Sequence, residues 1–325
     1  MHVSCALACG ACDSLDFGAA RAAATQQASA QLSKKKCADK AVECPLWARD
    51  GECERNPRYM KIHCASSCDT CDWADFDKRC RVDPSLTLAL PDGAIGELFR
   101  ALDGGAFAQY KPRIMSRPPE PWVVVFDSFI SEEDADRIVE LANLQNGSKF
   151  TPSQGTSGLD AQGQLIPSIS DYRTSSTRWC EADCLNESSV VHLRERVVQV
   201  TGVPDANHEY PQLLRYESSQ YYKEHSDYIP AHKHMPCGPR VLTLFVYLID
   251  VEKGGYTSFP KLGLSVQPKK GRAVLWPSVL DAAPMDIDER TVHVANPVIK
   301  GCKYSVNIWL HQMNFKDNHH IGCTG

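Results

Sequence analysis

At 325 residues, the chain is long enough for one large domain with smaller ones beside it. Hydrophobic residues make up 43% and charged residues 23% of the chain, which is ordinary for a globular protein and argues against wholesale disorder. The formal net charge of −5 provides no basic field for a nucleic acid, and no apolar stretch approaches the roughly 18 residues that a membrane span needs. We therefore expect no nucleic-acid partner and no membrane span in this chain, and composition leaves its oligomeric state open.

Cysteine is concentrated at the start of the chain, where ten of the 15 cysteines lie within the first 80 residues. A small segment this rich in thiols is typical of disulfide-stabilised domains in an oxidising compartment. Zinc is the alternative, but neither early segment contains two C-x2-C pairs in the C-x2-C…C-x2-C arrangement of strong zinc motifs. The opening residues lack the order of a secretory signal. We expect a protein of the secretory pathway, in the endoplasmic reticulum lumen, with a signal or anchor upstream of Met1.

The first 36 residues contain a short cysteine cluster and then a biased polar stretch. The spacing C-x3-C-x2-C occurs twice, at Cys5, Cys9 and Cys12 and again at Cys64, Cys68 and Cys71. We interpret residues 1–12 as the tail of a truncated cysteine-rich repeat, and a stray cysteine cluster is the alternative. Residues 13–36 are rich in Ala, Gln and Ser and end in a lysine run, which predicts a linker.

Residues 37–71 carry six cysteines with the spacing C-x6-C-x8-C-x10-C-x3-C-x2-C. A segment this small buries too little apolar surface to fold alone, so the pattern predicts a domain stabilised by three disulfides. Several pairings are possible, and the spacing alone does not select one.

This segment resembles the ShK toxin-like (ShKT) domain. The resemblance rests on residues between the cysteines, namely Asp39, Trp47, Gly51, Asn56, Pro57, Tyr59 and Met60. It implies the pairs Cys37–Cys71, Cys44–Cys64 and Cys53–Cys68, and it would make residues 1–12 the remnant of a second ShKT repeat.

Further along, residues 72–120 mix short apolar pieces with "SRPPEP", which predicts a linker and a segment that wraps the next domain. Cys80 in this stretch is a candidate to bridge the ShKT segment to that domain. "PWVVVFDSF" predicts a buried strand, and "SEEDADRIVELANL" predicts a helix with Ser131 as N-cap and Asp134 at the capping-box position. A second helix is expected around residues 187–201.

The rest of the chain consists of short strand patterns separated by turns. They are QLLRYES, RVLTLFVYLID, YTSFP, LSVQP, RAVLWPS, TVHVANPV and KYSVNIWLHQ. The absence of intervening helical patterns is typical of a β-sandwich or jelly roll. We expect a mainly β domain with flanking helices over residues 121–314 and a tail over 315–325.

His225 and Asp227 in "YYKEHSDYIP" are two residues apart, so on a strand they would point to the same face. A third metal ligand should come from a distant strand, and His293 in "TVHVANPV" is the strongest candidate. Two histidines and one carboxylate are the ligand set of non-haem Fe(II) oxygenases. Zinc hydrolases use similar ligands, so the triad alone leaves the chemistry open.

Lys303 follows His293 by ten residues, on what we expect to be the adjacent antiparallel strand. Apolar strand residues flank it, and a buried lysine is costly unless it meets an anion. The 5-carboxylate of 2-oxoglutarate is such an anion, because an oxygenase that binds this co-substrate at its iron needs a cation deeper in the barrel.

Residues from about 122 to 314 resemble the prolyl 4-hydroxylase catalytic domain of the Fe(II)/2-oxoglutarate dioxygenase superfamily. The matching motifs are RTSS, QLLRY, EHSDY, RVLTLFVYL, GGYTSFP, VQPKKGRAVLW and the residues from His293 to His311, in family order. The resemblance implies a double-stranded β-helix, or jelly roll, with Fe(II) bound by His225, Asp227 and His293.

It further implies that Lys303 pairs with the 5-carboxylate, with Tyr216 and Thr257 as hydrogen-bond partners and Trp309 lining the pocket. Arg240 and His311 match catalytic positions near the peptide groove. The implied cofactors are Fe(II), 2-oxoglutarate as co-substrate, O2 and L-ascorbate.

The loop between Asp227 and Arg240 departs from this pattern, because it reads "AHKHMPCG" where relatives carry an acidic, Gly-rich run. This difference puts the substrate preference in doubt. His232 and His234 in the loop are most simply surface residues; peptide contacts or an adventitious metal site are the alternatives.

The expected activity is peptidyl-proline 4-hydroxylation on Pro-rich or collagen-like chains, coupled to conversion of 2-oxoglutarate to succinate and CO2. An extended polyproline II substrate would suit an open groove. Two alternatives remain: the same chemistry on lysine or a small molecule, and a non-catalytic ShKT binding module.

Overall fold

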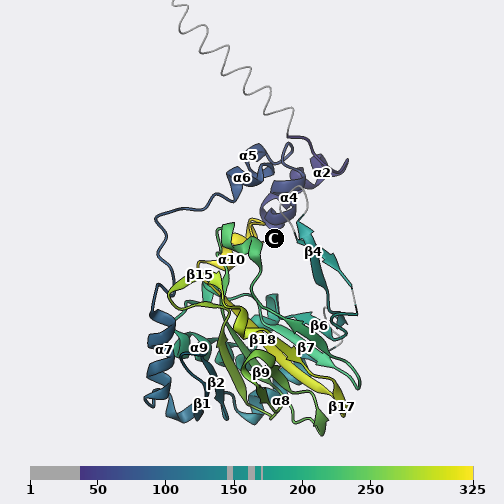
Figure 1. Ribbon diagram of the computed structural model, residues 1–325. Coiled ribbons are helices and arrows are strands. Elements are labelled where there is room, and N and C mark those ends of the chain that lie inside the picture. Colours follow the sequence, from purple (N-terminus) through teal and green to yellow (C-terminus); the bar gives the residue numbers. More distant parts are fainter. Residues whose placement is uncertain (1–36, 145–148, 160–164, 170, 325) are drawn as a thin grey trace, which may run out of the picture. The chain divides into compact units, whose positions relative to one another are not determined.

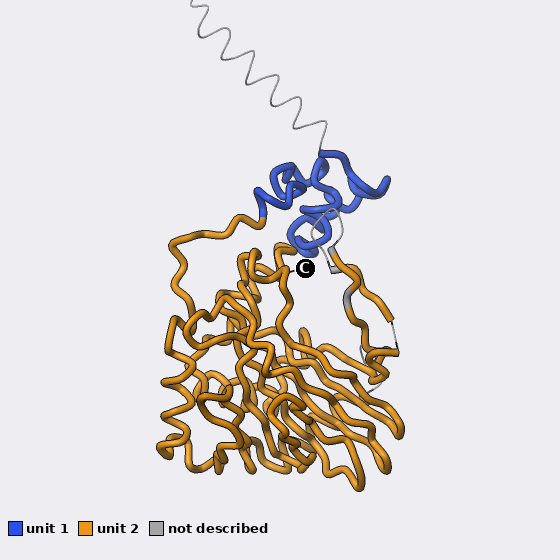
Figure 2. The backbone as a smooth tube through the Cα atoms, viewed as in Figure 1, with its two compact units in different colours: residues 1–79 blue, residues 80–325 orange. Residues whose placement is uncertain are grey.

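The computed structural model describes residues 37–144, 149–159, 165–169 and 171–324. The proposed truncated repeat (1–12) and linker (13–36) lie outside the described residues. The chain divides into two compact units, a small unit ending at Arg79 and a large unit from Cys80 onward (Figure 2).

The small unit is made of short helices joined by three disulfides. The helices are α2 (Cys44–Arg49), α3 (Glu52–Arg55), α4 (Pro57–His63), α5 (Cys71–Ala74) and α6 (Phe76–Arg79). The disulfides are Cys37–Cys71, Cys44–Cys64 and Cys53–Cys68, the pairs that the ShKT resemblance implies.

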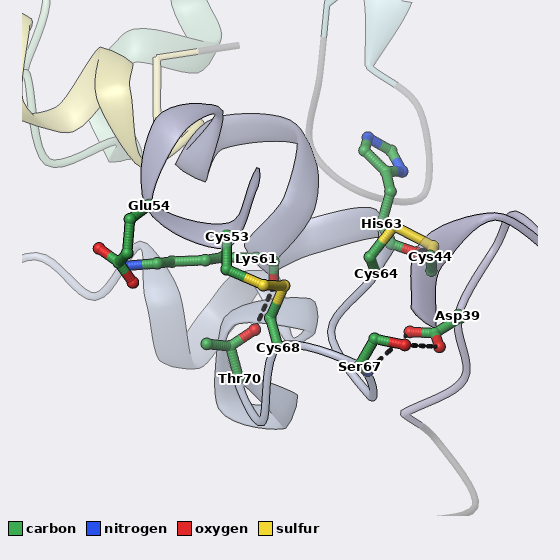
Figure 3. The surroundings of a disulfide bond; sticks show 10 residues. All are labelled: Asp39, Cys44, Cys53, Glu54, Lys61, His63, Cys64, Ser67, Cys68 and Thr70. Atoms are coloured by element: carbon green, nitrogen blue, oxygen red, sulfur yellow. Dashed lines mark hydrogen bonds and ion pairs between the residues drawn. A yellow bond between two sulfur atoms is a disulfide. The ribbon is translucent and has the colours of Figure 1, made fainter. Parts of the chain in front are cut away.

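Its apolar interior is small, since the buried cluster holds only Cys44, Met60 and Cys64, with half-buried side chains such as Trp47 around it. Polar contacts supplement the bridges, as Figure 3 shows: the Asp39 carboxylate accepts hydrogen bonds from the Ser67 backbone N–H at 3.0 Å and from its hydroxyl at 2.5 Å. The disulfides therefore supply the stability that a core this small cannot.

In the large unit, alternate side chains of the central strands face two different cores. Strand β9 (Arg240–Tyr247) directs Leu242, Leu244 and Val246 to one core and Phe245 and Tyr247 to the other. Because both faces of the sheet are covered, the strands read as nearly continuous apolar runs.

The main sheet has eight strands in the order β1-β2-β13-β9-β18-β7-β6-β3, with all of its strand pairs antiparallel (Figure 1). Besides β9, they are β1 (Pro112–Ser116), β2 (Val123–Phe126), β3 (Thr151–Pro152), β6 (Ser176–Trp179), β7 (Gln212–Tyr216), β13 (Ala273–Pro277) and β18 (Lys303–His311).

A second sheet of four strands has the order β12-β11-β16-β8. Its strands are β8 (Tyr222–His225), β11 (Thr257–Phe259), β12 (Leu264–Val266) and β16 (His293–Ala295). Three two-stranded pairs complete the unit: β4 (Gly155–Leu159) with β5 (Leu165–Ser168), β10 (Lys253–Gly254) with β17 (Val298–Lys300), and β14 (Val279–Leu280) with β15 (Ala283–Ile287).

Helices α7 (Ala94–Asp103), α8 (Glu132–Asn143) and α9 (Ser188–Thr201) contribute buried side chains to the core on one face of the main sheet. The other core holds Phe259, Val266 and Ala295 of the second sheet, so the two sheets pack face to face. The predicted jelly-roll class with flanking helices is confirmed. Among the described residues, no helix is both long enough and apolar enough to cross a membrane.

Helix α8 begins where its sequence predicts. Ser131 is the N-cap, and its hydroxyl accepts a hydrogen bond from the Asp134 backbone N–H at 3.0 Å. We expect Ser131→Ala to lower the free energy of unfolding by about 1 kcal/mol, because one helix N–H loses its acceptor. Chemical denaturation measures this, with Ser131→Asp as the matched control that restores the cap. Equal stability of all three proteins would contradict the assignment.

The segment 72–120 does more than the predicted linking and wrapping. Helix α7 buries Ile95, Phe99 and Leu102, and β1 forms an edge strand of the main sheet against β2. The tail over 315–325 contains α10 (Phe315–His320), followed by Cys323, which pairs with Cys80. Cys80 was a candidate to bridge the ShKT segment to the large domain, but its disulfide lies within the large unit, since both partners belong to it.

Candidate active site

Three candidate ligands meet in the second sheet. His225 ends β8 and lies directly opposite His293 of β16 in the antiparallel register, and Asp227 follows two residues after His225. One donor atom from each of the three side chains lies within 4.8 Å of the others. The Asp227 carboxylate is 3.5 Å from His293 Nε2. The strand register therefore brings together the three residues singled out in the sequence.

The hydrogen bonds of the two histidines leave the same nitrogen free in each. His225 Nδ1 lies 2.7 Å from the Lys223 carbonyl, and His293 Nδ1 lies 3.1 Å from the Thr291 carbonyl. A backbone acceptor at Nδ1 fixes the tautomer in which Nε2 carries the lone pair that a metal needs.

The charge states also suit a cation. Burial, and then the neighbouring His293, lowers the pKa of His225 well below its usual value, so this imidazole is neutral. Burial alone would raise the pKa of Asp227, but His293, His225 and Arg240 together outweigh burial and hold it below the ordinary value. The Thr243 hydroxyl adds a hydrogen bond to this carboxylate at 2.7 Å. Two imidazoles and one carboxylate are the donors that Fe(II) prefers.

Lys303 is the most unusual charge in the unit. Its side chain is 1% exposed, and Nζ has no hydrogen-bond partner among the described residues. The rings of Tyr216, Phe245 and Tyr247 surround it at 4.9 to 5.3 Å. Burial lowers the pKa of Lys303 to about 7. A buried ammonium without a counter-ion is costly, so the geometry calls for an anion.

A cavity connects the candidate ligands with the neighbours of Lys303. It is lined by Arg173, Tyr216, Tyr222, His225, Phe245, Thr257, Trp276, His293 and Asn307, among others. Tyr216 and Thr257 both line this cavity, and the Tyr216 ring lies 5.1 Å from Lys303 Nζ. Thr257 accepts a hydrogen bond from the Tyr247 hydroxyl at 2.7 Å, and this bond leaves the Thr257 hydroxyl hydrogen available to a ligand.

Lys303 lies on a different strand from the one expected. The strand after His293 is β17, and Lys303 starts β18, which lies in the main sheet between β7 and β9. The expectation of an adjacent antiparallel strand was wrong, because the turn after β17 (Val298–Lys300) carries the chain into the main sheet. The two sheets face each other, so Lys303 still points toward the site.

Arg240 and His311 are held by a buried carboxylate. Arg240 pairs with Glu209 at 2.5 and 3.1 Å, and His311 Nε2 lies 2.8 Å from the same carboxylate. His311 is fully buried, which corrects its expected position near a peptide groove. Arg240 instead donates toward the Asp227 carbonyl at 3.4 Å and so supports the candidate ligand loop.

Trp309 also differs from expectation. Its ring lies beneath the Arg240 guanidinium at 3.8 Å and beside Trp179, rather than lining the cavity next to His225. Sequence reasoning missed Glu209, Tyr247 and Asn307. The signal for Asn307 was available, because it lies four residues after Lys303 on β18 and therefore shares its face.

The remaining cysteines are now assigned. Cys180 and Cys184 form a disulfide, whereas Cys237 and Cys302 are the free cysteines among the described residues.

Comparison with known families gives two matches. Residues 211–311 match the 2OG-Fe(II) oxygenase superfamily, and residues 36–71 match the ShK domain-like family. The first match spans every candidate ligand together with Lys303, and the second covers the disulfide-rich segment.

Among curated relatives, the chain is 30% identical over 232 residues to prolyl 4-hydroxylase 2 of Arabidopsis thaliana, covering 63% of this chain and 73% of that protein. It is 31% identical over 197 residues to prolyl 4-hydroxylase subunit alpha-2 of Gallus gallus, covering 59% of this chain and 34% of the chicken protein. The chain therefore spans about a third of the chicken relatives that it matches.

Among solved structures, the viral collagen prolyl hydroxylase of Paramecium bursaria Chlorella virus-1, in its 2OG complex, aligns with a TM-score of 0.46 at 24% identity. This alignment covers 59% of this chain and 96% of the viral one.

Proposed function

Because the chain belongs to the prolyl 4-hydroxylase family of 2OG-Fe(II) oxygenases, we propose that it hydroxylates prolyl residues of proline-rich or collagen-like protein chains. In this reaction one oxygen atom of O2 enters the proline and the other enters succinate, while 2-oxoglutarate loses CO2. The catalytic part is the large unit, with the essential residues between positions 121 and 314.

The observation that carries the proposal is the pairing of the His225–Asp227–His293 cluster with an orphaned cation across one cavity. The three-residue cluster suits Fe(II), and Lys303 suits the carboxylate at the far end of a dicarboxylic acid. Bound iron would supply the oxidising chemistry by activating O2 with electrons from 2-oxoglutarate.

The roles of the protein's own residues follow from the geometry. His225 and His293 present Nε2, and Asp227 presents its carboxylate, which Thr243 supports by a hydrogen bond. Lys303 would bind the 5-carboxylate, with the hydroxyls of Tyr216 and Thr257 as hydrogen-bond partners. Phe245, Trp276 and Tyr222 exclude water from the cavity, which strengthens these polar contacts.

An exposed aromatic side chain beside the cavity supports a proline-rich substrate. Tyr172 is 44% exposed and its ring contacts Tyr222, which stacks on His225. Extended polyproline II chains dock on such aromatic surfaces because the helix is already ordered before binding.

L-ascorbate would serve as the reductant that restores iron oxidised in uncoupled turnovers. The secretory pathway, with the endoplasmic reticulum lumen as the site of action, is consistent with five disulfides among the described residues. The ShKT unit would contribute to binding of substrate or partner proteins.

Isotopically labelled dioxygen tests the proposal. The chain, loaded with Fe(II) and 2-oxoglutarate, is incubated with a proline-rich peptide and with a matched peptide in which alanine replaces each proline. We expect labelled oxygen in the proline peptide and in succinate, and none in the alanine peptide. The assignment of proline as the substrate would be contradicted if the label entered succinate and a lysine or small molecule but not proline.

The affinity for 2-oxoglutarate should depend on pH through Lys303. Its pKa of about 7 without an anion means that the ammonium form is lost as pH rises above this value. Because the dicarboxylate needs the charged form, affinity should weaken by up to about tenfold per pH unit above neutrality. Calorimetry with a redox-inert divalent ion measures this. Lys303→Arg, which keeps its charge, should show a flat profile; a flat profile for the wild type would contradict the role.

A further inference from the structure

A second cluster of ligating side chains lies outside the candidate iron site. It consists of His232 in the short helix η5 (Pro230–His234), Cys237 in the following loop and His311 at the end of β18. One donor atom from each residue lies within 4.8 Å of the others, and all three residues are buried. His232 is only 2% exposed, which corrects its expected place on the surface, and its neighbour His234 is not part of the cluster.

His232 is poised to bind a ligand. Neither of its ring nitrogens makes a hydrogen bond within the described part of the chain, although both are buried. Burial, and then the nearby His311 and Arg240, lowers the pKa of His232 to about 3, against the opposing effects of the Glu209 carboxylate and the Thr324 backbone. The ring is therefore a neutral imidazole whose lone pair faces no proton donor. A buried polar side chain without a hydrogen-bond partner needs an explanation, and a bound ion at this position would provide it.

Cys237 completes a mixed nitrogen and sulfur donor set. It is one of the two free cysteines that the structure describes, in a chain whose other described cysteines are paired. Its backbone is fixed, because its carbonyl accepts from the Met313 N–H at 2.9 Å. Its side chain is fully buried, so the thiol is protected from the oxidants that pair the other cysteines.

His311 already has the outer contacts of a metal ligand. Its Nδ1 lies 2.7 Å from the Gly238 carbonyl, and its Nε2 lies 2.8 Å from the Glu209 carboxylate. Metal-bound histidines almost always donate their second N–H to a carbonyl or carboxylate. Whichever nitrogen of His311 bound an ion, the other would keep such an acceptor.

We propose that His232, Cys237 and His311 form a second metal site, which takes Zn2+ or an ion of similar size and softness. Two imidazoles and a thiolate suit zinc, whereas the oxygen-rich sets of magnesium and calcium are absent from the cluster. Glu209, which pairs with Arg240 and His311, would be an outer partner of the site. Binding would displace the thiol proton of Cys237, because the thiolate is the form that ligates a metal.

The site would join the loop after Asp227 to the end of β18. His232 and Cys237 lie on the segment between Asp227 and Arg240, where the sequence departs from the prolyl 4-hydroxylase pattern. The ion would hold this segment in place, which is a structural role that does not depend on the proposed activity.

Cobalt(II) provides a test that separates the two sites. A cobalt–thiolate bond gives a near-ultraviolet charge-transfer band, and the candidate iron site contains no cysteine. The full chain is used with Cys5, Cys9 and Cys12 changed to serine, so that these residues cannot bind cobalt. We expect the band in this background, its loss in Cys237→Ser and in His232→Ala, and its retention in the matched control Cys302→Ser.

Metal content gives the second readout. After zinc loading and dialysis, Asp227→Ala protein in the same serine background should retain one zinc per chain, and adding Cys237→Ser to it should leave none. No cobalt–thiolate band in the folded background protein would overturn the proposal, as would a band that survives Cys237→Ser. Neither readout requires turnover, so failure of the proposed hydroxylation would leave this result standing.

Discussion

Changing Lys303 to methionine should abolish productive binding of 2-oxoglutarate while making the ligand-free protein more stable. Without the ammonium, the 5-carboxylate would be buried with no charge partner, at a cost of about 3–5 kcal/mol. This corresponds to an affinity loss of roughly 100-fold to more than 1,000-fold. Titration calorimetry measures the affinity, and turnover at saturating peptide measures the consequence.

The gain in stability of the Lys303→Met protein follows from removal of the buried, unpaired ammonium. The lowered pKa of Lys303 means that the folded state holds its proton less tightly than the unfolded state does. The penalty is therefore fully present below pH 7 and fades as pH rises toward the ordinary lysine value. Lys303→Met should raise the melting temperature most at and below neutral pH.

Lys300→Met is the matched control, because the Lys300 side chain is 72% exposed and pairs with Glu252 on the surface. It should change neither affinity nor stability appreciably. A Lys303→Met protein with normal affinity for 2-oxoglutarate would show that the anion is bound elsewhere.

Changing Asp227 to alanine should remove the only carboxylate of the three-residue cluster and with it most iron binding. Loss of an outer partner typically costs 10- to 100-fold in metal affinity or activity, so loss of a direct ligand should exceed about 100-fold. Iron content after dialysis and the rate of succinate formation check this together.

The control for Asp227→Ala is Asp171→Ala, which removes a carboxylate that is 87% exposed and pairs with Lys223. This variant should keep its iron and its activity. Full iron content in Asp227→Ala would mean that the metal lies outside the His225–Asp227–His293 cluster.

Patterns within single strands could be read from the sequence. The apolar strand patterns of β9 and β18 and the Ser131 cap of α8 are local features, and each was predicted correctly. His225 and Asp227 could be singled out because they are close in sequence, and His293 because a histidine on a later strand could share their face.

Features set by the pairing of distant strands could not be read in this way. Lys303 lies in the main sheet and not beside β16, because the turn after β17 switches sheets. Glu209 shows no local signal, and its role depends on Arg240 and His311, which are 31 and 102 residues away. Strand β1 is short and only partly buried, so its pairing with β2 decides its structure.

The most direct test of the account is succinate formation by the Fe(II)-loaded protein, with and without proline-rich and collagen-like peptides. We predict that these peptides stimulate succinate formation, and that the peptide gains the mass of one oxygen atom on proline in equal amount. If succinate forms but no peptide stimulates its formation, the protein is a 2-oxoglutarate oxygenase and the assignment of prolyl residues as substrate is wrong. An iron-loaded protein that forms no succinate under either condition would contradict the account as a whole.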